Sequence, residues 1–354
     1  MRLAKTAEFR LPDKVGSLIR AGSCLVSGVG VFYAVVWWDG GARYALVSIA
    51  DQVVHTMVLD ELGDPFDAAY DAPAPVLLDD GAFGVIADAG TLRVYGTDLR
   101  LRREIAIAGD DVLHRFAKHG QRPRVTGNAS RGALAAEHVV VLDEPIAVGN
   151  PRYLAFLRIG ETSASWTRIG TLGPDGFPVD RFGDDELNQS PDVSVDGCII
   201  GDAVGHGGSM LVCVEGSDAS SVRKYGADFF TITRVTPDGT VTEPLYQQSG
   251  WKRLPGKHAI NGKVTSSGRY VLLTPVFATG EWKGRQRLFD LGTGEVLEPV
   301  LPRGAAKMRI VDHAGATFWL SDGAQRILCA EAEGPSPTLR APRVGLGRAA
   351  RLDP

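Results

Sequence analysis

Six Asp-Gly pairs, each beside a run of apolar residues, are the feature that most constrains the fold of this chain. They occupy residues 39–40, 80–81, 175–176, 196–197, 238–239 and 322–323. Both residue types tolerate positive φ, so these pairs favour tight turns between antiparallel strands. The runs between them are short, rich in Val, Ile, Leu, Phe and Tyr, and almost free of helical periodicity. The chain is therefore predicted to be all-β, with one hairpin following another.

A repeated four-strand unit is clearest between Val264 and Val300. Two strands are predicted around Ser267-Gly268 and two more around Thr293-Gly294. This stretch resembles the blades of WD40 and TolB-type β-propellers, in which one strand ends in Trp-Asp or a similar pair, and Phe289-Asp290 takes that place here. Residues 190–201 resemble a second blade opening with inserted residues. The resemblance implies a closed β-propeller of four-stranded blades.

The repeat also predicts how many blades there are and how the ring closes. On this template, blades begin near Leu18, Val76, Gly132, Val193, Val264 and Met308. We expect about six blades, with seven as the alternative because residues 216–246 have room for a further half blade. The last segment, 308–332, supplies about three strands, so Arg2–Leu11 is predicted to complete that blade and remove its free edge. The predicted propeller spans residues 1–333, and the Pro-, Gly- and Arg-rich residues 334–354 form a tail.

Composition narrows the classes of partner. A net charge of -4 provides no general basic field for nucleic acid. The longest apolar stretch, Val29–Trp38, is about half the length that crosses a bilayer, and the N-terminus has no apolar signal region. No membrane partner is therefore predicted.

Cysteine usage bears on the compartment. Four cysteines lie singly in apolar segments, without the spacing of a zinc site or a redox pair: Cys24, Cys198, Cys213 and Cys329. This pattern favours buried free thiols in a reducing compartment. A cytoplasmic protein is expected, and no metal or other cofactor is predicted.

Propeller geometry predicts the face that carries function. The four strands of a blade are named A to D from the inside outward, and the D-to-A and B-to-C connections share a face. In propellers, ligands usually bind there. The template assigns residues 110–125, 182–192, 205–208, 250–263 and 279–285 to this face. Four of the chain's seven histidines lie in these segments: His114, His119, His206 and His258.

Two groups of ligand-binding candidates also lie in these segments. Trp251, Lys252 and Arg253 combine a stacking surface with cations that suit an anion, and Asn261 adds an amide close by. Asn188 and Asp192 precede a predicted inner strand, where side chains line the channel of a propeller. The alternatives are that Trp251 fills the gap between blades and that Asp192 caps a turn.

Two functions remain open. A binding or scaffolding propeller, which holds a protein, a peptide or a small anionic molecule, requires the least of the sequence. The alternative is a hydrolase, lyase or cyclase at the channel mouth. It would use His206 or His258 as the acid/base group, with His114 nearby and Arg253 as an anion clamp. The chain has no Gly-x-Ser-x-Gly, Walker or His-Glu-x-x-His motif that would name a reaction.

Overall fold

A computed structural model describes the chain over the residues that follow. They are 1–41, 43–59, 75–78, 82–88, 91–108, 124–125, 130–131, 137–143, 152–159, 163–172, 178–179, 198–206, 209–216, 227–235, 245–252, 260–275 and 285–333. The regular secondary structure in these residues is all β apart from one short 3-10 turn, η1 (Asp39–Gly41). No helix in this part of the chain is long and apolar enough to cross a membrane.

Four of the five sheets have four strands each, all antiparallel. The first contains β2 (Val15–Val26), β3 (Val29–Trp38), β4 (Arg43–Ala50) and β5 (Val53–Leu59). The second contains β16 (Cys198–His206), β17 (Ser209–Gly216), β18 (Ala227–Val235) and β19 (Tyr246–Lys252). The third contains β20 (Ile260–Val264), β21 (Tyr270–Pro275), β22 (Arg287–Asp290) and β23 (Glu295–Leu297). The fourth contains β24 (Arg309–Ala314), β25 (Thr317–Ser321), β26 (Arg326–Ala332) and β1 (Leu3–Arg10).

The fifth sheet has ten strands and consists of two antiparallel sets. One set is β6 (Pro75–Leu77), β7 (Phe83–Asp88), β8 (Thr91–Tyr95) and β9 (Leu101–Ala108). The other is β10 (Arg124–Val125), β11 (Ser130–Arg131), β12 (Glu137–Asp143), β13 (Arg152–Ile159), β14 (Ser163–Leu172) and β15 (Pro178–Val179). The sets are joined where β9 pairs in parallel with β14.

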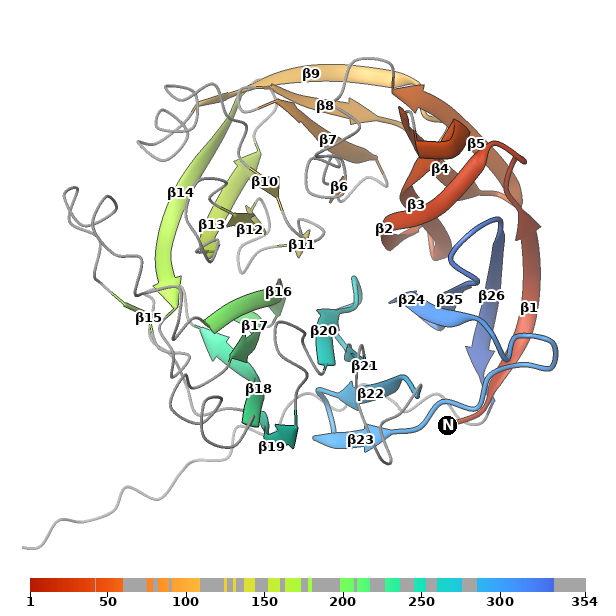
Figure 1. Cartoon of the computed structure of the whole chain (residues 1–354). Helices are drawn as coiled ribbons and strands as arrows, with labels where there is room; N and C mark the ends of the chain where they lie inside the picture. The colour runs from red at the N-terminus through yellow and green to blue at the C-terminus, as the bar shows by residue number, and fades with distance from the viewer. Residues whose placement is uncertain are drawn as a thin grey trace, which may run out of the picture.

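The sheets follow one another in chain order around a common centre (Figure 1). β2 contacts β6, β6 contacts β11, β12 contacts β16, and β16 contacts β20. β24 contacts β21 on one side and β2 on the other, so the contacts return to the first sheet. β2, β16, β20 and β24 lie innermost, and β5, β19, β23 and β1 lie outermost. The predicted all-β architecture of four-stranded antiparallel sheets is confirmed.

The N-terminal strand completes the last sheet. β1 pairs antiparallel with β26, from Leu3 opposite Ala332 to Arg10 opposite Arg326. The backbone of Leu3 also donates a 2.9 Å hydrogen bond to the carbonyl of Val300, between β23 and β24. The predicted pairing of the N-terminal strand with the last sheet is confirmed.

The long apolar run of the sequence becomes a strand buried on both faces. Along β3, Phe32, Ala34 and Val36 pack toward the β24–β26–β1 sheet, where the ring of Phe32 stacks on Trp319 at 5.0 Å. The alternate residues face the β6–β9 strands, and Tyr33 stacks on Phe83 at 4.4 Å. Because side chains alternate along a strand, a continuous apolar run supplies two cores at once.

Turn chemistry agrees with the sequence at both Asp-Gly pairs in the described residues. Asp39 and Gly40 have φ of 53° and 73°, and Gly323 has φ of 85°. The turns predicted at Ser267-Gly268 and Thr293-Gly294 also separate paired strands. The other four Asp-Gly pairs lie outside the described residues.

The prediction of buried thiols holds for only one of the two cysteines whose side chains are described. Cys329 is buried, and desolvation raises its pKa to about 12, so the thiol stays protonated. Cys24 is only partly buried, which corrects the prediction at that position. Its side chain lies near the end of β2, where the sheet gives less cover.

Candidate functional site

Five of the site residues predicted from the sequence lie outside the described residues: His114, His258, Asn188, Asp192 and Arg253. The other four lie in strands whose backbone is described. His206 ends β16, Trp251 and Lys252 end β19, and Asn261 is the second residue of β20. The chain therefore reaches β20 from β19 through a D-to-A connection, as the template predicts.

The placement predicted for residues 205–208 is wrong. His206 pairs with Ser209, and β16 and β17 are the two innermost strands of their sheet, so this is an A-to-B turn and not a B-to-C connection. The error arose because β16 continues to His206, where it still pairs with the start of β17. His206 thus lies at the far end of its inner strand from the D-to-A connections. The shared face assumed for a histidine-based enzyme site is not supported.

A pocket lies between the β20–β23 sheet and β24, with a volume of about 300 Å³. We call it the seam pocket. It is formed by the end of the B-to-C connection from β21 to β22 and by the D-to-A connection from β23 to β24. The lining residues are Thr274, Arg285, Gln286, Glu298, Pro299, Val300, Leu301, Ala306, Met308 and Arg309. One predicted face residue, Arg285, is among them.

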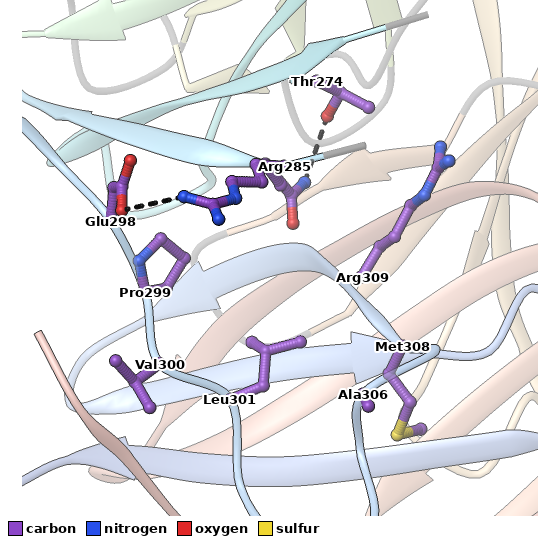
Figure 2. Close-up of a pocket in the computed structure, with 10 residues that line it drawn as sticks. Thr274, Arg285, Glu298, Pro299, Val300, Leu301, Ala306, Met308 and Arg309 are labelled. Atoms are coloured by element: carbon purple, nitrogen blue, oxygen red, sulfur yellow. Dashed lines mark hydrogen bonds and ion pairs between the residues drawn. The ribbon is translucent and has the colours of Figure 1, made fainter. Parts of the chain in front are cut away.

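The pocket has a polar side and an apolar side. Figure 2 shows Thr274, Arg285 and Glu298 on one side, with Val300, Leu301 and Met308 opposite them. Met308 is buried in the core between the two sheets, and Leu301 packs against that core. The apolar side is thus continuous with the hydrophobic core, which fixes its position.

Gln286 joins the two sheets at the polar side of the pocket. Its amide nitrogen donates to the hydroxyl of Thr274 at 3.1 Å and to the carbonyl of Ile310 at 2.8 Å. Its amide oxygen accepts a 2.8 Å hydrogen bond from the backbone of Ile310. With both ends of the amide engaged, Gln286 fixes β24 against the connection that carries Arg285.

The opposite wall is held by the start of the chain. The backbone of Val300 donates to the carbonyl of Met1 at 2.8 Å, and the backbone of Leu3 donates to the carbonyl of Val300 at 2.9 Å. The backbone of Val300 is therefore hydrogen-bonded to the N-terminal segment on one side, and the pocket lies on the other side.

Charge in the pocket is not balanced. The carboxylate of Glu298 forms an ion pair with Arg287 at 3.2 Å and a longer one with Arg285 at 3.8 Å. Arg309 is exposed, and within the described part of the chain its side chain makes no hydrogen bond or ion pair. Two guanidinium groups and one carboxylate therefore line the pocket, in a chain whose net charge is -4.

The pocket residues were largely missed from the sequence. The signal was present: the connection from β23 to β24 combines Val300, Leu301 and Met308 with cations at Arg303 and Lys307, and β24 begins with a third cation, Arg309. An apolar stretch that alternates with cations in an irregular connection is typical of an anion-binding loop as well as of a solvated one. Only the packing of this loop against Arg285 distinguishes the two.

A buried polar cluster joins three sheets near their inner strands. Asp312, on β24, accepts hydrogen bonds from the hydroxyl of Ser23 at 2.8 Å and from the backbone of Ser266 at 2.8 Å. The ammonium of Lys263 donates to the carbonyls of Ala21 and Val311 at 2.6 and 2.7 Å. These bonds connect β2, β20 and β24. The carboxylate and the ammonium are engaged with the protein itself, so the cluster supports the fold.

Asp290, at the position that the blade template marks, is also structural. It is buried. Its Oδ1 accepts a hydrogen bond from the backbone N–H of Gly292 at 2.8 Å, and its Oδ2 accepts one from the guanidinium of Arg269 at 3.3 Å. It thereby caps the turn into β23, as an aspartate does in such a turn. No group of three or more His, Cys, Asp or Glu side chains that could hold a metal occurs among the described residues.

Comparison with known proteins gives only distant similarities. No protein-family model matches the chain, and no curated protein matches it. The Swd1 β-propeller domain from Myceliophteria thermophila is 10% identical, with 93% of this chain and 99% of that one covered and a TM-score of 0.42. The WD40 domain of Toxoplasma gondii coronin is 7% identical, with 94% and 87% covered and a TM-score of 0.43. BamB from Moraxella catarrhalis is 9% identical, with 94% and 99% covered and a TM-score of 0.39.

Scores this low carry no weight for the fold, which is identified by the arrangement of the sheets. Four-stranded antiparallel sheets follow in chain order around one centre, and their contacts lead from the last sheet back to the first. The first strand of the chain completes the last sheet. This is the architecture of a β-propeller.

Proposed function

We propose that this chain is a binding propeller of six blades that holds an anionic group of a peptide, protein or small molecule in the seam pocket. The count of six treats the ten-stranded sheet as two blades, because its halves are each antiparallel and meet through one parallel pairing of β9 with β14. The proposed domain spans residues 1–333, with 334–354 as a tail. The cytoplasmic location expected from the sequence remains a prediction.

One observation carries the binding proposal: two arginines stand over an apolar floor on fixed elements. Arg309 begins β24, which Gln286 bonds to the neighbouring sheet, and Arg285 precedes Gln286 directly. A guanidinium presents its N–H donors in a planar fork that matches a carboxylate or a phosphate. Because the elements are already fixed, ligand binding costs little ordering of the backbone.

The proposal is tested by titrating three anions into the full chain at pH 8 and low salt: hexanoate, hexyl phosphate and a pentapeptide with a C-terminal leucine. Isothermal titration calorimetry should show binding of at least one of them. Arg309→Gln should weaken that binding about tenfold, the value of a charge-assisted contact of about 1.4 kcal/mol. The effect should shrink at higher salt because the site is open to solvent.

Arg303→Gln is the matched control. Arg303 lies in the same connection and is exposed but does not line the pocket, so its loss should leave the affinity within about twofold. If none of the three anions binds, or if the two variants lose equal affinity, the seam pocket is not the binding site.

A further inference from the structure

We infer, on the basis of the proposed binding function, that an anion in the seam pocket locks the closing strand β1 onto the last sheet. One wall of the pocket, residues 298–301, is held in place by the start of β1. Three features of the described residues support this inference. They are the hydrogen bonds between the wall and β1, the hydrophobic core that the two share, and the independent support of the opposite side of the pocket.

The backbone of Val300 is hydrogen-bonded to the N-terminal segment through both of its polar groups. Its N–H donates to the carbonyl of Met1 at 2.8 Å, and its carbonyl accepts from the N–H of Leu3 at 2.9 Å. Val300 and Arg2 thus form a parallel β-bridge. Leu3 begins β1 and lies opposite Ala332 of β26. The backbone of the wall is therefore bonded to the strand that completes the last sheet.

Side chains from the pocket and from β1 meet in one hydrophobic core. Leu3, only 2% exposed, belongs to the same buried cluster as Met308, which lines the pocket. Leu301, another lining residue, packs against that cluster. If β1 left β26, Leu3 would leave this core, and the wall would lose packing as well as hydrogen bonds. The pocket in its present shape thus requires β1 to be docked, that is, paired with β26.

The polar side of the pocket has separate support. The side chain of Gln286 exchanges two 2.8 Å hydrogen bonds with the backbone of Ile310, which join the connection that carries Arg285 to the strand that Arg309 begins. None of these bonds involves β1. Figure 2 shows the apolar wall across the pocket from this side. A ligand that contacts both sides therefore connects elements fixed by Gln286 to a wall fixed by β1.

Ligand binding and docking of β1 are then thermodynamically linked. A ligand that binds only while β1 is docked favours the docked state by a factor of one plus the ratio of its concentration to Kd. At ten times Kd, undocking of β1 should become about tenfold rarer. By the same linkage, docking of β1 raises the affinity of the pocket. An occupied seam pocket thus acts as a lock on the closing strand.

Hydrogen–deuterium exchange of the full chain, measured by mass spectrometry on peptides that cover β1 and β5, tests this lock. The probe is the tightest binder among hexanoate, hexyl phosphate and the pentapeptide with a C-terminal leucine, at ten times its Kd. Exchange of the β1 amides should slow about tenfold, because they exchange when β1 leaves β26. β5 is also an outermost strand but contributes no residue to the pocket lining, so its exchange should slow by less than about twofold.

Arg309→Gln and Arg303→Gln are the matched variants. Arg309→Gln binds about tenfold more weakly, so the same anion concentration should slow β1 exchange only about twofold. Arg303 lies outside the lining, and Arg303→Gln should retain the tenfold effect. If the anion binds but slows β1 and β5 equally, or slows neither, the lock is refuted and the binding function stands. If none of the three anions binds, both are refuted.

Discussion

His313 shows how burial removes an ordinary charge from the propeller interior. Its Nδ1 lies 2.7 Å from the hydroxyl of Ser267, and its ring contacts those of Tyr270 and Phe318 at 4.9 and 4.3 Å. Desolvation, aided by the nearby positive charge of Arg269, lowers the pKa of His313 to about 4. The imidazole is therefore neutral at physiological pH, and its role is structural.

The lowered pKa predicts a stability that depends on pH. The unfolded chain takes up the His313 proton near pH 6.5 and the folded chain only near pH 4, so stability is full above about 6.5 and falls between these values. Urea unfolding should give a free energy lower by about 2 kcal/mol at pH 5 than at pH 7 from this group. His313→Gln should reduce that difference, whereas the same change at His55 should leave it intact.

Sequence reasoning at the residue scale was strongest where local chemistry decides the structure. The turn residues Asp39, Gly40 and Gly323 were predictable because positive φ restricts the choice of residue. Arg309 was not, because a cation in a loop gives no sign of whether it meets a pocket or solvent. That depends on Gln286, a residue 23 positions earlier that fixes the two sheets together.

Among the elements, β1 contributes to stability by completing the last sheet. It covers the free edge of β26, and its residues enter both adjacent cores: Leu3 is 2% exposed and packs with Leu328, and Phe9 lies 6.4 Å from Trp319. An uncovered β26 would present a row of unpaired backbone groups to other chains.

Removal of one of these contacts should therefore destabilise the whole ring. Phe9→Ala is expected to lower the free energy of unfolding by about 3 kcal/mol through lost burial and the cavity left beside Trp319. Urea unfolding followed by Trp fluorescence measures the change. Lys5→Ala, at an exposed position of the same strand, should stay within about 0.5 kcal/mol. Equal effects of the two variants would mean that β1 stabilises through its backbone alone.

Element-scale prediction succeeded for strands and failed for one connection. Alternating apolar and polar residues, together with turn residues, predicted the strands between residues 264 and 300 and those between 308 and 332. These hairpins are predictable because the pattern lies in the residues of each hairpin itself. The turn after His206 was assigned to the wrong pair of strands because its glycines suit any hairpin. Which hairpin of a sheet a turn closes depends on how the sheets pack.

At the scale of the whole molecule, Asp312 and Lys263 both make hydrogen bonds that connect three sheets, and Asp312 is the acceptor among them. It is completely buried and receives donors from the β2 strand and from the turn between β20 and β21. Asp312→Ala would leave the buried hydroxyl of Ser23 and the backbone of Ser266 without their acceptor. Buried groups left in this way cost several kcal/mol in total.

We therefore expect Asp312→Ala to lower the free energy of unfolding by at least 3 kcal/mol, and Asp312→Asn, which keeps one acceptor oxygen, by less. Chemical denaturation at pH 7 gives both values. Asp13→Ala, at an exposed position, provides the reference and should have an effect close to zero. An Asp312→Ala variant as stable as the reference would show that the three sheets stay joined without this cluster.

The resemblance of two segments to propeller blades predicted the four-stranded sheets, and the three strands counted in the last segment predicted that β1 would pair with β26. The sequence did not predict that β9 and β14 would pair in parallel and merge two sets of strands into one sheet. Ser163–Ser165 and Ala106–Ala108 carry no turn signal or charge pattern that marks them as partners. Their pairing results from how the ring brings two outer edges together.

The pairing of β1 with β26 also sets the order of events during synthesis. More than 300 residues separate Leu3 from its partner Ala332, so β1 leaves the ribosome long before the strand with which it pairs has been made. Until then the nascent protein carries an open ring, and the apolar residues of β1, Leu3 and Phe9, have no neighbouring sheet to cover them. Contacts this distant slow folding and lengthen exposure to aggregation. Holdase chaperones should accordingly act on β1 while the residues between it and β26 are still being made.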